Sequence, residues 1–287
     1  MPSEREISQA VFDGISTGAY YAVTALAFSV LWATVRTVNL ALIQVVAIGA
    51  ITTALLAPQG AVVALLGACV AGLVAGVATH YTAVATTVRH GFIAPVIATL
   101  GVGLVLEGLM SVTVGDNTRA VDVNLPDSSV TLLGAQMTWP HIIVLGVITA
   151  VLVGYGIIAR LTPLGLAFRA TAWNRELADA YGVNVRRVQF VSASGAALVA
   201  GLTGWCIAVV GGNASPVTGA EVGLYGILAM LIGGAGNPVG AVLGGLTVGL
   251  INSFGATIVS SSVQSQLSLG LIFCILILRP TGLLKGV

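Results

Sequence analysis

Three long stretches of this sequence contain no charged side chain, and they restrict the fold more than any other feature. No Asp, Glu, Lys or Arg lies between Arg36 and Arg89, between Arg187 and Glu221, or between Glu221 and Arg279. A helix needs about 20 apolar residues to cross the hydrocarbon core of a bilayer, so each stretch has room for one or more crossings. Only 7% of the 287 residues are charged, whereas a soluble domain has about 25%. We therefore expect an integral membrane protein with several spans.

The apolar runs are typical of helices, because the strands of a membrane β-barrel are about 10 residues long and alternate in hydropathy. The expected spans cover residues 15–35, 39–57, 61–79, 92–114, 142–160, 188–210 and 265–279. The Gly-rich region 223–258 is interrupted at NPVG, and it fits either a re-entrant half-helix followed by one span or two crossings. The sequence therefore predicts an all-α polytopic membrane helix bundle, a single domain over residues 1–287, with about 8–10 transmembrane helices and a Gly-rich broken or re-entrant segment.

The distribution of arginine predicts the orientation of the bundle. Five arginines lie between residues 160 and 187, and short loops rich in Lys and Arg stay in the cytoplasm. The loop 115–141, which holds Asp116, Asp122 and Asp127, then falls outside, and Arg279 with Lys285 favours a cytoplasmic C-terminus. Nine spans with an external N-terminus satisfy all of these loops. The first residues lack a basic segment followed by a cleavage site, so we expect the first apolar segment to remain as a membrane helix.

The sequence gives no indication of an enzyme. It contains no H-E-x-x-H or G-x-x-x-x-G-K-[ST] motif. The histidines fall at expected span ends without metal-ligand spacing; they are His80, His90 and His141. The cysteines lie inside apolar spans, where we interpret them as small packing residues; they are Cys69, Cys206 and Cys274. We expect no metal and no cofactor, and the net charge of +1 gives no sign of nucleic-acid binding.

Three polar residues within the spans are candidates for a substrate pathway. Glu107 lies in the fourth span, and an ionisable group in a membrane usually faces a bundle interior or an aqueous cavity. It could line a path, couple to protons, or serve as a structural hydrogen-bond partner. Asn39 and Gln44 open the second span, about 140° apart on a regular helix. They would share a face only if the helix were unwound between them, and hydrogen bonding between packed helices is the alternative.

The charged loop predicts a short amphipathic helix in the cytoplasm. Residues 169–188 read RATAWNRELADAYGVNVRRV, in which Trp173, Leu177 and Tyr181 recur at i, i+4 and i+8. Gly182 follows the last periodic residue, where helices commonly end. Such a helix is too short to be stable alone. Its apolar face needs a partner, which could be the membrane surface, the rest of this protein or another subunit.

Small residues crowd the region after residue 230. Gly240 and Gly244 have the small-xxx-small spacing that lets helix backbones approach closely in lipid. We expect Gly233, Gly234, Gly236, Pro238, Gly240 and Gly244 to pack helices or to break them. Close packing in a bundle is sufficient to explain this composition, so these residues do not by themselves identify a function.

Four blocks in order resemble the permease subunits of branched-chain amino-acid ABC importers of the LivH-like family. They read FDGISTGAYYAVTALAFSVLW, TPLGLAFRATAWNRELADAYGVNVRRV, LIGGAGNPVGAVLGGLTVG and RPTGLLKG, and together they extend over almost the full chain. The second block resembles the family's cytoplasmic loop at Gly165, Ala167, Arg169, Ala170, Ala180 and Gly182. The chain departs from the family pattern at residues 42–44, where a His and a Gly are missing, at Leu166, at Pro238, and at Glu107, where the family often has Gln.

This resemblance implies a mechanism and a set of partners. Such a permease pairs with a second, related permease subunit, with two cytoplasmic ABC ATPase subunits and with an extracytoplasmic substrate-binding protein, in the bacterial inner membrane. The short helix of the loop 161–187 would dock in the ATPase and transmit its motion, through Arg169, Trp173, Arg175, Glu176, Leu177, Asp179, Ala180 and Gly182. The implied solute is a branched-chain or hydrophobic amino acid. Urea, short amides and other small organic solutes are alternatives, and a proton-coupled secondary transporter using Glu107 is an alternative of a different class.

Overall fold

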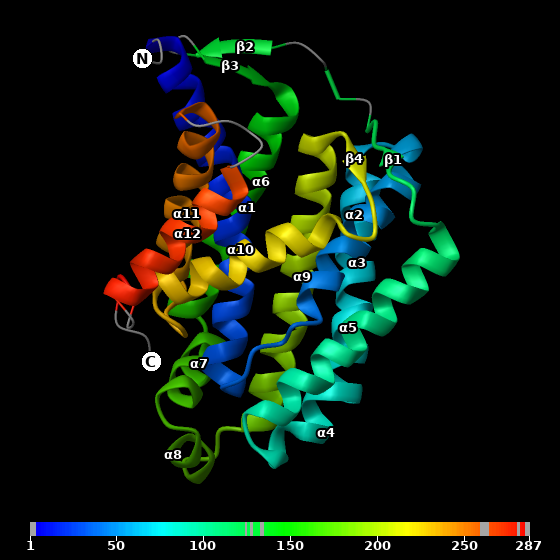
Figure 1. The fold of residues 1–287 in the computed structure, drawn as a ribbon. Helices are drawn as coiled ribbons and strands as arrows, with labels where there is room; N and C mark the ends of the chain where they lie inside the picture. Colours follow the sequence, from blue (N-terminus) through cyan, green and yellow to red (C-terminus); the bar gives the residue numbers. More distant parts are fainter. Residues whose placement is uncertain are drawn as a thin grey trace.

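The protein is a bundle of helices in the computed structural model, which describes residues 4–123, 125–126, 129–132, 135–258, 264–279 and 282–284 (Figure 1). Asp127 and Lys285, used above for orientation, and Pro280 and Thr281 of the last block lie outside the described residues. The helices are α1 (Glu4–Val35), α2 (Leu42–Leu56), α3 (Ala61–Thr79), α4 (Ala85–Thr87), α5 (Ile93–Val114), α6 (Trp139–Leu161), α7 (Pro163–Trp173), α8 (Arg175–Ala180), α9 (Val185–Gly211), α10 (Thr218–Gly233), α11 (Pro238–Ile258) and α12 (Gln264–Leu278).

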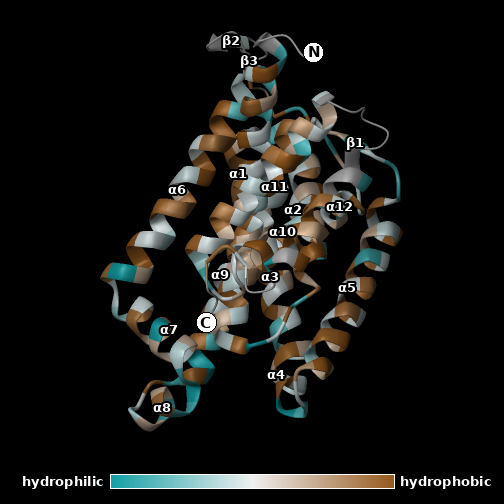
Figure 2. Cartoon of the chain, turned by 60° about the vertical axis from the view of Figure 1, so that its left-hand side comes forward, coloured by the Kyte–Doolittle hydropathy of each residue, from teal (hydrophilic) through white to brown (hydrophobic). Residues whose placement is uncertain are grey.

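Seven helices within the described ranges are long and apolar enough to cross a membrane, which confirms the expected polytopic bundle. They include α1, α2, α5, α6, α9 and α11, together with a continuous helical stretch from Ala61 to His90 that joins α3 to α4 through a π-helical turn at His80–Val84. The helices α10 and α12 are shorter, with 16 and 15 residues. Figure 2 shows hydrophobic residues along most of the length of α5 and α6, and hydrophilic ones gathered around α7 and α8 at one end.

The centre of the bundle is built on α1, because this helix packs against α9, α10 and α11. Its contact with α11 is made largely through glycine. A Cβ added at Gly18 would press on the backbone of Leu246, and one added at Gly245 or Gly249 would overlap Ala22 or Gly18. The side-chain-free surfaces therefore let the two backbones touch, as expected for helices that associate in lipid.

The Gly-rich region forms two helices separated by a sharp break, which confirms the broken segment. The helix α10 spans about 24 Å at 1.5 Å per residue, less than the hydrocarbon thickness of about 30 Å, and it runs across the bundle at a steep angle to α9 (Figure 1). Gly234 and Gly236 have positive φ angles of 106° and 84°. The helix α11 then starts at Pro238, where the missing N–H costs nothing.

The glycines at this break hold α10 and α11 together. A Cβ at Gly233 would overlap the carbonyl of Gly240, and a Cβ at Gly244 would overlap the carbonyl oxygen of Ala229. A residue that follows α12 also binds the end of α10, because the backbone N–H of Leu283 donates to the carbonyl of Ile232 at 2.6 Å. In the structure, Gly233 and Gly244 thus lie where the two backbones approach closely, and Gly234 and Gly236 lie in the break.

The second span begins later than the sequence predicts. Residues 36–41 are not helical, Arg36 has a φ of 58°, and α2 starts at Leu42 rather than at residue 39. Figure 1 shows this link leaving the lower end of α1 and climbing back into the bundle before α2 begins. A positive φ is uncommon for a non-Gly residue, and no Gly or Pro in this stretch signals the break.

Two small antiparallel ribbons lie at the end of the molecule opposite α8 (Figure 1). The strand β1 (Arg119–Ala120) pairs with β4 (Asn213–Ala214), and β2 (Ser129–Leu132) pairs with β3 (Ala135–Thr138). The first ribbon ties the loop after α5 to the turn between α9 and α10. The expected all-α class holds, since these strands are confined to loops.

Candidate translocation and coupling sites

A polar cluster surrounds the unwound link between α1 and α2. Asn39 is only 4% exposed, and its side-chain oxygen Oδ1 accepts a hydrogen bond from the backbone N–H of Ala41 at 3.1 Å. The N–H of Leu40 donates to the hydroxyl of Thr99 on α5 at 3.2 Å. Thr99 was not singled out from the sequence, because a hydroxyl in an apolar helix carries no signal of its partner. These bonds satisfy backbone groups that the missing helical turn leaves free.

Gln44 and Glu107 are brought together at the same place. The amide Nε2 of Gln44 on α2 donates to the side-chain oxygen Oε2 of Glu107 on α5 at 2.8 Å, within the normal range for a hydrogen bond. Gly103, one turn before Glu107, faces α2, since a Cβ placed there would lie 3.6 Å from the Cα of Ala41. All three pathway candidates therefore gather where α5 meets the start of α2.

Two buried oxygens in this cluster are without a hydrogen-bond partner among the described residues. They are Oε1 of Gln44 and Oγ1 of Thr37. An unsatisfied buried polar atom costs about 1–3 kcal/mol, and such atoms in native structures point to water, an ion or a functional role. The link thus carries one unused oxygen, on Thr37, and the first turn of α2 carries another, on the Gln44 that binds Glu107.

The charged loop forms two helices rather than one. The helix α7 ends at Trp173, and Asn174 leaves the helical region with φ −150° and ψ 113°. Its side-chain oxygen accepts from the N–H of Leu177 at 3.0 Å, so it caps a new helix, α8. Sequence periodicity missed this break because Trp173 and Leu177 keep helical spacing across the cap. The helix α8 ends at Ala180, two residues before Gly182, whose φ of 85° suits glycine.

Three large apolar side chains of this loop are mostly exposed to the surroundings of the bundle. Trp173, Leu177 and Tyr181 are 83%, 53% and 86% exposed. Glu176, Asp179 and Ala180 are exposed beside them, while Ala178 faces inward and is buried. Arg175 is partly buried, and this desolvation lowers the pKa of its guanidinium. Arg169 is exposed on α7 and borders an apolar groove between α6, α7 and α11.

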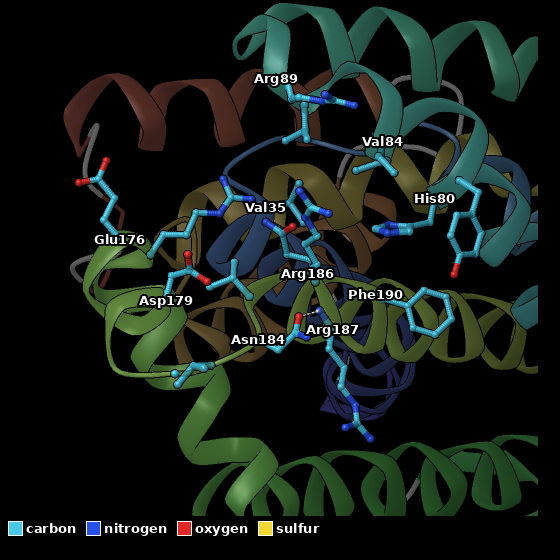
Figure 3. Close-up of a pocket in the computed structure, with 18 residues that line it drawn as sticks. Val35, His80, Val84, Arg89, Glu176, Asp179, Asn184, Arg186, Arg187 and Phe190 are labelled. Carbon is cyan, nitrogen blue, oxygen red and sulfur yellow. Dashed lines mark hydrogen bonds between the residues drawn. The ribbon is translucent and has the colours of Figure 1, made fainter.

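A cavity of about 1180 Å³ opens between this loop and the end of the helical stretch that leads to α5. Figure 3 shows Arg89 and Arg186 on opposite walls, with His80 directed inward and Glu176 pointing away. The charged residues that line it are Arg89, Arg175, Glu176, Asp179, Arg186 and Arg187. The cavity therefore presents charge of both signs next to the exposed apolar residues of α8.

The end of α1 is tied to both helices that flank α8. The guanidinium Nη2 of Arg36 donates to the carbonyl of Ala172 at the end of α7, at 2.8 Å. The amide Nε2 of Gln189, in the first turns of α9, donates to the carbonyl of Thr34 at 3.1 Å. Sequence reasoning missed both residues, because they act between elements more than 130 positions apart.

The described residues hold no group of three His, Cys, Asp or Glu side chains placed to bind a metal ion. Cys69, Cys206 and Cys274 are free thiols. The polar side chains that do gather are those of the unwound link and of the cavity.

Comparison with known proteins identifies the family. The family model "branched-chain amino acid transport system / permease component" matches residues 10–278. The chain is 24% identical to the high-affinity branched-chain amino acid transport system permease protein BraD of Pseudomonas aeruginosa, over 99% of this chain and 97% of that protein. It is also 24% identical to the LivH permease proteins of Salmonella typhimurium and Escherichia coli K12, over 96% of this chain and 94% of each relative.

Among solved structures, PsaBC from Streptococcus pneumoniae in complex with Fab matches 96% of this chain and 92% of that chain, with 16% identity and a TM-score of 0.49. The family model covers most of the chain, and the relatives match nearly end to end. The protein is a multi-pass membrane protein that belongs to the family of branched-chain amino acid transport system permease components.

Proposed function

We propose that this chain is the permease subunit of an ATP-driven ABC importer and forms the translocation path for a branched-chain or hydrophobic amino acid. ATP hydrolysis takes place on two separate cytoplasmic ATPase subunits, a second permease subunit completes the membrane part, and an extracytoplasmic binding protein delivers the solute. Residues 1–287 act as one permease domain. The proposal rests on the membership of the family and on the amino-acid transport of the named relatives.

The unwound link at residues 36–41 is the single observation that carries the proposed path. Non-helical backbone at membrane depth is tolerated where it is buried in protein or lines a water-filled cavity. The helix α2 has 15 residues and spans about 22 Å, less than the hydrocarbon thickness of about 30 Å. The non-helical link therefore covers part of the path of the chain from the end of α1 back into the bundle. Asn39, Gln44 and Glu107 meet there, and the unused oxygens of Gln44 and Thr37 suit a polar solute group or water.

The loop 161–187 is proposed as the ATPase-coupling element. Exposed aromatic and aliphatic side chains on a short helix are costly in water and fit the apolar groove of a partner. Trp173, Leu177 and Tyr181 supply that surface. The charged rim of Arg175, Glu176 and Asp179 sits beside it and borders the cavity, where it can fix the register of the docked subunit.

This assignment sets the orientation in the bacterial inner membrane. The loop 161–187 lies in the cytoplasm, as its arginine content favours. The helix α1 begins at the opposite end of the bundle from α8 (Figure 1), and its start is therefore extracytoplasmic in this proposal. The ribbons β1–β4 and β2–β3 then face the binding protein.

The test is reconstitution of the complete importer in liposomes with ATP inside and radiolabelled leucine, urea or a short amide outside together with the binding protein. We expect leucine uptake that stops when ATP is replaced by a non-hydrolysable analogue. Uptake of urea or an amide instead would assign a related importer. Uptake by the permease alone, driven by a proton gradient and abolished in Glu107→Gln, would replace the proposal by a proton-coupled carrier.

A further inference from the structure

Two side chains, the exposed Arg36 and the buried Gln189, connect the elements around the coupling loop to the end of α1, and each does so by binding the C-terminal end of a neighbouring helix. The last carbonyls of a helix have no partner within that helix. Arg36 donates to the carbonyl of Ala172 at the end of α7, where a cation is also favoured by the helix dipole. Gln189 donates to the carbonyl of Thr34 at the end of α1.

Apolar packing holds the same three helix ends together. Ala33 of α1 is buried against Phe168 and Ala172 of α7, and Val30 and Val188 pack around them. The helices α7 and α9 are the two elements that enter and leave α8. A displacement of α8 must therefore move the end of α1, or else break this packing and both hydrogen bonds.

Arg36 is at once a contact of the coupling loop and the first residue of the unwound link. Its φ of 58° redirects the chain from α1 toward α2. Asn39 lies three residues later, which is at most about 10 Å along the chain. Beyond it, Leu40 binds Thr99 on α5, and Gln44 binds Glu107. A continuous set of contacts thus runs from α7 and α9 to the polar cluster.

We propose that Arg36 and Gln189 are positioning residues that transmit movement of the loop 161–187 to Asn39 and to the Gln44–Glu107 pair. The inference rests on the proposed function, because it assumes that an ATPase moves α8. Neither residue touches the solute or the ATPase in this scheme. Their loss uncouples the two sites, so that ATP is hydrolysed without proportionate transport.

The experiment uses the complete importer in liposomes and measures solute transported per ATP hydrolysed. Arg36→Gly removes the guanidinium and tolerates the positive φ, and Arg36→Lys keeps a cation at the end of α7. We expect the ratio to fall roughly tenfold in Arg36→Gly, within the usual range of coupling between sites, with partial recovery in Arg36→Lys. ATPase co-purification and basal hydrolysis should stay at the wild-type level.

Three further variants separate coupling from folding. Gln189→Leu keeps the side chain's bulk and removes its donor, so it should lower the same ratio even if Arg36→Gly fails to assemble. The double variant should lose less than the sum of the two single effects on a logarithmic scale, because both act on one element. Arg160→Gln, which removes an exposed arginine at the end of α6, should leave the ratio unchanged.

A wild-type ratio in both Arg36→Gly and Gln189→Leu would overturn the inference while leaving the importer intact. A fall in transport that matches a fall in assembled complex would overturn it too, since the residues would then be structural. If the wild-type complex itself shows no ATP-driven uptake, the proposed function fails instead.

Discussion

Gln44 and Glu107 join α2 to α5 through a hydrogen bond of 2.8 Å between Nε2 and Oε2. The two residues are 63 positions apart in the sequence, and α5 otherwise makes few contacts within the bundle. An intramembrane carboxylate therefore holds the start of α2 against a helix whose other faces are largely exposed. Movement of α5 would separate the pair and open the polar cluster.

Glu107→Gln should alter uptake without preventing assembly. The amide is nearly isosteric, but it presents one oxygen acceptor where the carboxyl group has two, so the hydrogen bond from Gln44 can be lost, a difference of about 1 kcal/mol or about fivefold. We expect a change of that size in the KM or the maximal rate of uptake, measured in liposomes, with ATPase binding retained. Glu221→Gln, at an exposed position on α10, is the matched control. Unchanged uptake kinetics would make Glu107 a structural residue.

Asn39→Ala should impair transport more than folding. It removes the acceptor for the buried N–H of Ala41, which costs about 1–3 kcal/mol of stability. Asn39→Ser keeps a short uncharged side chain whose hydroxyl oxygen can accept from the same N–H, so it should fold more nearly like the wild type. Thermal unfolding of the purified protein and uptake by the importer are measured side by side. Loss of expression in Asn39→Ala would instead show that its role is to hold the core.

Truncation of the exposed apolar residues on the coupling loop should release the ATPase subunits. Burying a leucine side chain contributes roughly 1.5–3 kcal/mol, so Leu177→Ala should weaken ATPase binding by at least about tenfold, and Trp173→Ala should have a similar effect. Titration of detergent-solubilised permease with purified ATPase measures the change. Val112→Ala, at a residue of α5 that is 86% exposed, should bind normally. Equal binding by all of these variants would exclude this surface from docking.

Gly233→Ala should destabilise the corner between α10 and α11. The added methyl group would overlap the carbonyl of Gly240, and overpacking of this kind costs about 1–3 kcal/mol. Gly195→Ala is the control, because a Cβ there meets open space on α9, and Ala is a better helix former by up to about 1 kcal/mol. The free energy of unfolding in lipid should fall for the first variant and hold or rise for the second.

The parts of the fold that follow from length and hydropathy were accessible from the sequence. The span predicted at 92–114 is α5, from Ile93 to Val114, and the span predicted at 188–210 lies within α9. Bilayer thickness sets such lengths, and Gly115 and Gly212, both with positive φ, end these helices. The Gly-rich break could also be predicted, because Gly has no Cβ and Pro has no backbone N–H, and both residues therefore interrupt helices.

The features on which the proposed mechanism depends were not accessible in the same way. Arg36 adopts a conformation that its residue type disfavours, and the surrounding contacts with α7 hold it there. Asn174 restarts the helix by capping Leu177, although the apolar period runs through it unbroken. The pairing of Gln44 with Glu107 is a tertiary contact, which no local pattern encodes. Their proposed roles in the path and in coupling await the experiments above.

The glycine contact between α1 and α11 has a consequence for biosynthesis. Gly18 and Gly249 are roughly 230 residues apart in the chain, yet their backbones touch. At a synthesis rate of about 5–20 residues per second, α1 leaves the ribosome on the order of 10–50 s before α11. During that interval the first helix sits in the bilayer without the surface it will pack against. The glycine surface of α1 carries no polar side-chain atom that lipid would leave unsatisfied. The central helix of the bundle can therefore be inserted first and packed against α11 last.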